Sequence, residues 1–198
     1  IGAHIWKLVS GAWVDEGVSE VASGEGDLRM QHHRLGDYLF YISDYQPHLL
    51  QRSSDDGLSY TQIYDTGAFK LLGIGYGTNK IAIAVEGTGS NTNVLVSTDF
   101  GNSWSTLFTT ADAITDVVAV AVSKDDSKVS LVSYMFSGPD ALFGYWENSD
   151  SFTLVITNEL PTNLYNETFA TYNDSGNIQI LWQHENAGVN ANKAYLNT

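Results

Sequence analysis

Apolar residues gather along the chain in short runs, and each run follows a turn that is polar or contains glycine. Four of these runs begin at equivalent positions, namely Tyr38, Ile81, Val129 and Ile178. Successive starts lie 43, 48 and 49 positions apart. No segment of useful length shows the periodicity of an amphipathic helix, whereas short apolar runs bordered by turns are typical of strands. The pattern therefore predicts an all-β chain built from repeated units.

Each repeat divides further into four short strands, here called A to D in chain order. In the clearest repeat the predicted strands are residues 71–77, 80–86, 93–98 and 104–108. The repeat before it predicts strands at residues 28–33, 38–44, 49–53 and 59–64, and the repeat after it at residues 116–122, 129–136, 141–146 and 152–157. A period of about 40 to 50 residues with several short strands is typical of β-propeller blades. We therefore predict a β-propeller of four-stranded antiparallel blades.

The turn between strands C and D carries a sequence motif. Residues 97–104 read Ser-Thr-Asp-Phe-Gly-Asn-Ser-Trp, and residues 53–60 read Ser-Ser-Asp-Asp-Gly-Leu-Ser-Tyr. Their final aromatics lie 44 positions apart, which agrees with the period of the strands. A degenerate third copy, residues 145–152, has Glu147 at the aspartate position. The motif positions of the two better copies are Ser53, Asp55, Gly57, Tyr60, Ser97, Asp99, Gly101 and Trp104.

These motifs resemble the Asp box, S-x-D-x-G-x-[ST]-W, of sialidase-type and related β-propellers. Aspartate can accept bonds from nearby backbone N–H groups, and glycine adopts a backbone that other residues disfavour. The final aromatic combines an apolar body with a polar tip. The residues therefore predict rigid hairpins. The resemblance implies that Asp55 and Asp99 are structural and lie away from any catalytic face.

Both ends of the chain continue the strand pattern. Residues 5–9 and 13–16 are a predicted C strand and D strand, and Trp13 lies 47 positions before Tyr60. The C-terminus supplies predicted A, B and C strands at residues 164–172, 178–184 and 193–198. We expect the N-terminal strands to complete the last blade, so that residues 1–198 form one domain of about four blades without open edges. Both ends offer a C strand, so five blades or an arc of a longer chain are alternatives.

Charge and composition narrow the range of partners. The chain has 23 acidic and 9 basic side chains, a formal net charge of −14, and no cysteine. Such a chain repels phosphate backbones, which argues against nucleic acid, and no apolar run reaches the roughly 18 residues of a membrane span. The surface must be rich in uncharged polar residues because only 16% of the residues are charged. We expect an extracellular, cell-surface or virion-associated protein without membrane insertion.

The residues give weak support to an enzyme. The resemblance implies that a sialidase would need an arginine triad, and of Arg29, Arg34 and Arg52 only Arg29 lies on a predicted inner strand, with Arg34 in an A–B turn. Other glycosidases need two carboxylates about 5 to 10 Å apart. The carboxylates predicted near the upper face are Asp44, Glu86, Asp116 and Glu167. Nothing in the sequence pairs them, and no metal site, cofactor site or catalytic residue is predicted.

Binding is the leading hypothesis. In propellers the B–C and D–A loops form one face, and five candidate ligand-binding residues lie in or near these loops. They are Arg29, Tyr45, His48, Trp182 and His184. Aromatic rings beside hydrogen-bonding groups suit sugars, although Trp182 is also a candidate core residue between blades. We expect a non-enzymatic propeller that presents loops to a glycan or protein partner. The alternatives are a glycoside hydrolase or lyase, and an assembly factor similar to the Asp-box propeller that aids photosystem II assembly.

Overall fold

The structure is a computed structural model, and it describes residues 4–18, 33–42, 49–110, 114–137, 140–157, 168–184 and 193–197. Two compact units divide the chain, Ile1–Leu71 and Leu72–Thr198, here called unit 1 and unit 2. The described part of the chain is built from antiparallel strands, and its one helical segment is a single 3-10 turn, Thr88–Ser90. These observations confirm the all-β prediction.

Unit 1 contains a hairpin and a four-stranded sheet. The hairpin pairs β1 (His4–Val9) with β2 (Ala12–Val18). Sheet I has the strand order β3-β4-β5-β6. Its strands are β3 (His33–Leu35), β4 (Tyr38–Ile42), β5 (Leu49–Ser53) and β6 (Thr61–Asp65). Sheet order therefore follows chain order, as expected for a meander.

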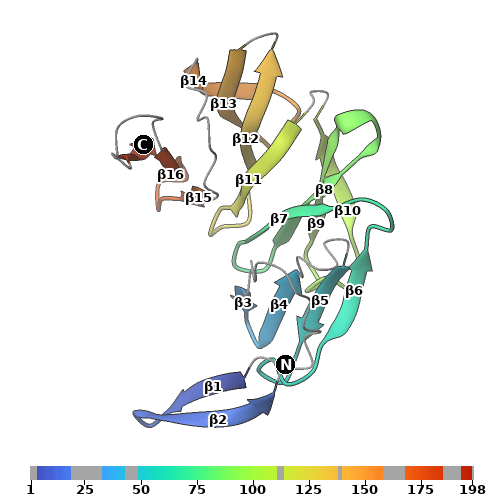
Figure 1. The fold of residues 1–198 in the computed structure, drawn as a ribbon, viewed down its shortest axis with the longest axis vertical. Helices are drawn as coiled ribbons and strands as arrows, with labels where there is room; N and C mark the ends of the chain where they lie inside the picture. The colour runs from blue at the N-terminus through green and yellow to red at the C-terminus, as the bar shows by residue number, and fades with distance from the viewer. Residues whose placement is uncertain are drawn as a thin grey trace. The chain divides into compact units, whose positions relative to one another are not determined.

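Unit 2 contains three sheets that repeat this order (Figure 1). Sheet II consists of β7 (Leu71–Tyr76), β8 (Ile81–Glu86), β9 (Thr92–Ser97) and β10 (Ser105–Thr109). Sheet III consists of β11 (Ile114–Val122), β12 (Val129–Ser137), β13 (Asp140–Glu147) and β14 (Phe152–Thr157). Sheet IV has three strands, β15 (Thr168–Tyr172), β16 (Ile178–His184) and β17 (Lys193–Asn197).

Where the structure describes them, the predicted strands are confirmed, and three of them, β5, β14 and β16, match residue for residue. One local prediction is wrong. Arg34 was expected in an A–B turn, but it lies in β3 opposite Leu39, and the turn is formed by Gly36 and Asp37. Because the turn has only two residues, the pairing of β3 with β4 continues through Arg34 to Leu35, closer to the turn than the sequence predicted. The predicted strand residues 28–32, 43–44, 164–167 and 198 lie outside the described residues.

Every D strand carries an irregularity that the sequence pattern did not reveal. The pairing of each C and D strand skips one residue of the D strand, which makes a β-bulge. The skipped residues are Glu16, Ile63, Leu107 and Val155. Each lies three positions after an aromatic residue, and these aromatics are Trp13, Tyr60, Trp104 and Phe152. The shared position supports the prediction that β1 and β2 are a C strand and a D strand.

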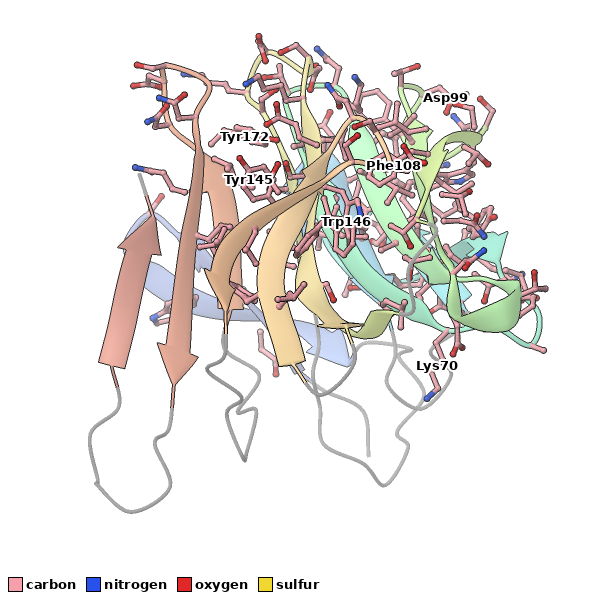
Figure 2. The ribbon with its side chains drawn as sticks, turned by 90° about the horizontal axis from the view of Figure 1, so that it is seen from above. Lys70, Asp99, Phe108, Tyr145, Trp146 and Tyr172 are labelled. Atoms are coloured by element: carbon pink, nitrogen blue, oxygen red, sulfur yellow. The ribbon has the colours of Figure 1, made fainter. Side chains whose placement is uncertain are left out.

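The main core of unit 2 lies between sheets II and III. It contains Trp146, which is fully buried, together with Phe108 and Leu131. Figure 2 shows Trp146 and Phe108 close together in the interior. A second cluster joins sheets III and IV through Val132 and Ile180. Sheet III therefore buries one face against sheet II and the other against sheet IV. In sheet II, the continuous apolar run Ile81–Val85 of β8 is buried at every position.

The order of the strands gives each sheet two distinct ends. The A–B and C–D turns lie at one end, called the turn end, and the B–C and D–A connections lie at the other, called the loop end. Contacts between A–B turns place the turn ends of sheets II, III and IV on the same side of unit 2. The described pairings join β1 with β2 and leave β17 at the edge of sheet IV. Closure by the terminal strands, and with it the single domain, stays a prediction.

Candidate functional site

The two Asp-box motifs form closely similar turns at the C–D connections. In the turn of residues 97–104, Asp99 accepts bonds from the Ser103 backbone N–H (2.9 Å), the Ser103 hydroxyl (2.6 Å) and the Ser97 hydroxyl (2.8 Å). The Ser97 hydroxyl oxygen in turn accepts the N–H of Gly101 at 2.8 Å, and Gly101 has a left-handed φ of 87°. The Trp104 indole N–H donates to the Gly101 carbonyl at 3.1 Å. These residues of the motif therefore find hydrogen-bond partners within the same turn.

Asp55 repeats this arrangement in unit 1. Its carboxylate accepts the Ser59 N–H at 2.9 Å, the Ser59 hydroxyl at 2.5 Å and the Ser53 hydroxyl at 2.7 Å. The Ser53 oxygen accepts the N–H of Gly57 at 2.8 Å. Beside this turn, the Arg52 guanidinium lies 4.6 Å from the centre of the Tyr38 ring. Both aspartates are therefore bonded within their own turns, and Arg52 packs on an aromatic ring beside one of them.

Hydrogen bonds hold both carboxylates in the ionised form. The Ser103 hydroxyl and N–H, followed by the Ser97 hydroxyl, lower the pKa of Asp99 from 3.8 to about 2. Ser59 and then Ser53 lower the pKa of Asp55 to about 2 in the same way. A carboxylate that stays ionised and accepts three bonds within its own turn is a poor general acid at neutral pH. These bonds agree with the predicted structural role of the boxes, which stays a prediction.

We expect the box carboxylates to make stability depend on acidity. The pKa of Asp99 is lower in the folded chain than its ordinary value of 3.8. Its stabilisation is therefore complete above about pH 4 and is lost as the pH falls toward about 2. Urea unfolding followed at several pH values should show a weaker decline between these limits for Asp99→Asn than for the wild type. The matched control is Asp174→Asn, which removes an exposed carboxylate outside the boxes. Equal slopes for the wild type and Asp99→Asn would contradict the prediction.

Sequence reasoning missed a third acidic turn at the A–B connection of sheet III. Asp125 accepts the Ser123 hydroxyl at 2.6 Å and the Ser127 hydroxyl at 2.8 Å, and these bonds lower its pKa to about 2. The next residue, Asp126, has a left-handed φ of 63° and contacts sheet II. The signal was present in the Ser-x-Asp spacing of residues 123–125, which the box motifs share. In sheet IV, Asn173 takes the equivalent capping role by accepting the N–H groups of Ser175 and Asn177.

The degenerate box behaves differently from the other two. Glu147 does not cap its own turn; it accepts the Tyr172 hydroxyl of sheet IV at 3.0 Å and pairs with Lys128 at 3.4 Å. Tyr172 is also 2.5 Å from the Ser130 hydroxyl, and its burial raises its pKa well above the usual range. Figure 2 shows Tyr172 near Tyr145 of sheet III. Glu147 therefore joins two sheets at their turn ends.

Of the five candidate ligand-binding residues, the structure describes two, Trp182 and His184. Arg29, Tyr45 and His48 lie outside the described residues. In β16, Trp182 pairs with Thr168 and Tyr195, and His184 pairs with Lys193. His184 is thus the last residue of its strand and immediately precedes the connection at residues 185–192. The structure does not test whether these five residues share one site.

The candidate carboxylates are placed only in part. Glu86 is exposed at the end of β8, and Asp116 lies in β11, whereas Asp44 and Glu167 fall outside the described residues. Within the part of the chain that it describes, the structure therefore shows no two of these carboxylates brought together as the glycosidase alternative would need, and that alternative stays a hypothesis. Among the described residues, no group of three or more His, Cys, Asp or Glu side chains is placed to hold a metal ion. In the same part of the chain, no helix is long and apolar enough to cross a membrane.

Comparison with known proteins identifies the architecture. No family model and no curated protein matches the sequence. TolB from Acinetobacter baumannii aligns with a TM-score of 0.50 at 13% identity, over 79% of this chain and 37% of TolB. YCF48 bound to D1 peptide aligns with a TM-score of 0.47 at 9% identity, over 83% of this chain and 56% of YCF48. An ancestral GH74 enzyme aligns with a TM-score of 0.44 at 14% identity, over 81% of this chain and 31% of the enzyme.

TolB is a β-propeller protein, and its match adds to the repeated antiparallel sheets described above. This chain has a β-propeller fold. At 13% identity the likeness to TolB shows the fold alone, and the chain spans 37% of the length of TolB. The finer resemblance to Asp-box propellers stays a prediction.

Proposed function

We propose that this propeller is a non-enzymatic binding or structural protein that presents its loop end to a glycan or protein partner at an extracellular or virion surface. The observation that supports this proposal is that three acidic side chains at the turn ends of sheets I, II and III already have hydrogen-bond partners. There the acidic side chains of Asp55, Asp99 and Asp125 accept bonds within their own turns. Because these three carboxylates already accept bonds, they are poor candidates for ligand contacts, and we expect the candidate residues of the loop ends to supply those contacts instead.

The chemistry of the loop-end candidates favours a sugar or an aromatic-binding protein surface. Tyr45 and Trp182 offer flat apolar faces, and His48 and His184 offer hydrogen bonds. A net charge of −14 adds repulsion toward acidic partners and attraction toward neutral or basic ones. The proposal therefore favours neutral glycans and basic proteins over sialylated or sulfated glycans.

A glycan array followed by titration calorimetry tests this proposal. We expect the wild-type chain to bind a neutral glycan without releasing product, and Trp182→Ala and His184→Ala to weaken binding at least tenfold, or about 1.4 kcal/mol. Asp150→Ala, an exposed substitution at the turn end, is the matched control and should bind normally. Thermal unfolding of Trp182→Ala checks whether that residue serves the core instead.

Two results would overturn the proposal. Released sugar that disappears in variants of Asp44, Glu86, Asp116 or Glu167 would establish the hydrolase or lyase alternative. Binding that is lost in Asp150→Ala but kept in both loop-end variants would move the site to the turn end. Capture of a basic protein instead of a glycan would keep the loop-end site and decide the class of partner.

A further inference from the structure

We propose that the A–B turn of sheet II is an anion-binding site whose resident ligand is the Asp126 carboxylate of sheet III. The site consists of residues 77–80 and is called the amide nest. When the Asp126 side chain is removed, the nest is expected to take a small free carboxylate such as formate. This inference is independent of the loop-end function proposed above.

Three successive backbone amides converge on one carboxylate. The N–H of Thr78 donates to Asp126 Oδ1 at 2.8 Å, and the N–H of Asn79 donates to Oδ2 at 2.9 Å. The N–H of Lys80 also donates to Oδ1, at 3.3 Å. Consecutive N–H groups that point into one concavity bind anions through their partial positive charges. Sheet II therefore supplies the anion-binding N–H groups, and sheet III supplies the bound carboxylate.

The space for the anion depends on a glycine. A Cβ atom added to Gly77 would lie 2.0 Å from Asp126 Oδ1 and 2.8 Å from the Ser123 carbonyl oxygen. Gly77 does not have a left-handed φ, so its backbone would accept other residues. Glycine is needed here because the carboxylate occupies the position of a side chain. This observation is separate from the hydrogen bonds and points to the same cavity.

Other contacts keep the nest in place without the carboxylate. The Thr78 hydroxyl donates to the Lys124 carbonyl at 2.5 Å, and the Lys80 ammonium donates to the main-chain carbonyl of Asp126. Within the nest, the Gly77 N–H donates to the Lys80 carbonyl at 2.8 Å. These bonds use backbone atoms that remain when the side chain of residue 126 is cut back. The empty nest should therefore keep its shape and its unpaired N–H groups.

The test compares Asp126→Gly with the wild type in the presence of formate. Asp126 has a φ of 63°, which glycine adopts readily, so the substitution removes the ligand without straining the backbone. We expect a lower Tm for Asp126→Gly and a saturable recovery of most of that loss as sodium formate is added, because a ligand that binds only the folded state stabilises it. Sodium chloride at the same ionic strength should not restore the Tm. The wild type, whose nest is filled, should respond equally to both salts.

Two further variants sharpen the result. Asp56→Gly is the matched control, because Asp56 has a similar φ of 58° in a turn of unit 1; formate should not stabilise it beyond chloride. Adding Gly77→Ala to Asp126→Gly fills the cavity and should abolish the formate effect. If Asp126→Gly does not fold, amide exchange in Asp126→Asn keeps the proposal testable. That variant keeps one acceptor oxygen and replaces the other with a donor, so it should lose protection at Thr78 or Asn79 while the amides of β8 stay protected.

The proposal is overturned by any of three outcomes. Asp126→Gly with the wild-type Tm would show that the carboxylate contributes nothing to the contact. Equal responses of Asp126→Gly to formate and chloride would show that no site is vacated. A formate effect that survives Gly77→Ala would place the binding elsewhere in the chain.

Discussion

Replacing Trp146 with alanine is expected to lower the free energy of unfolding by about 3 to 5 kcal/mol, the usual cost of deleting a buried large aromatic side chain. Trp146 is fully buried in the core between sheets II and III. Its ring centre lies 4.6 Å from that of Phe152, at an angle of 51°. A side chain of this size leaves a cavity that the paired strands of sheet III cannot close by themselves. Urea unfolding followed by far-UV circular dichroism measures the loss.

Trp146→Phe separates the packing of this residue from its polarity. Within the described part of the chain, the Trp146 Nε1 atom is buried and has no hydrogen-bond partner. Phenylalanine therefore loses ring volume but no hydrogen bond, and it removes a polar group whose burial is unfavourable. We expect a cost of about 1 to 2 kcal/mol, clearly below that of alanine. A Phe variant as unstable as the Ala variant would instead indicate a hydrogen bond to bound water.

The features that sequence predicted best are those whose partners are close in the chain. Asp99 finds its partners at Ser97 and Ser103, so the motif contains both sides of each interaction and its hydrogen bonds could be predicted from the sequence. The alternation of apolar residues predicted β14 and β16 to the residue for a similar reason. A turn on each side fixes the length of a short strand.

The features that sequence missed depend on neighbouring repeats. Asp126 contacts Thr78 across 48 positions, and Lys128 contacts the Gly176 carbonyl across 48 positions as well. This separation is close to the period of the repeat, so each contact joins equivalent turns of adjacent sheets. The sequence of one turn does not indicate that its backbone N–H groups donate to a residue in the equivalent turn of the next sheet. The contact of Glu147 in the degenerate box could not be predicted for the same reason, because its partner Tyr172 lies in sheet IV.

The proposed binding residues were hard to predict for a different reason. The loop connections carry little periodicity, and their residue types indicate chemistry without indicating distance. Trp182 and His184 are placed by strand pairing alone, and Tyr45 belongs to a connection outside the described residues. The scaffold was predictable because it repeats, whereas the proposed binding face was not, because each loop differs from the others.

Gly75→Ala is expected to destabilise the chain by about 3 kcal/mol, near the upper end of the usual cost of overpacking. Gly75 is buried in β7, and an added Cβ would lie 2.6 Å from the Val120 carbonyl oxygen and 2.8 Å from its carbon in β11. Both contacts are with backbone, which cannot rotate away as a flexible side chain can. Sheets II and III would have to move apart, and that movement would also loosen the core around Trp146.

Gly89→Ala distinguishes this steric effect from the ordinary cost of replacing glycine. Gly89 has a left-handed φ of 72° and no atom within 4 Å of an added Cβ, so its substitution should cost only about 1 kcal/mol from backbone strain. Urea unfolding of both variants compares the two losses of stability. The double variant Gly75→Ala, Trp146→Ala should lose less stability than the sum of the two single variants, because both substitutions act on the same contact between sheets II and III. Equal costs for Gly75→Ala and Gly89→Ala, or strict additivity with Trp146→Ala, would mean that the backbones of β7 and β11 do not meet at Gly75.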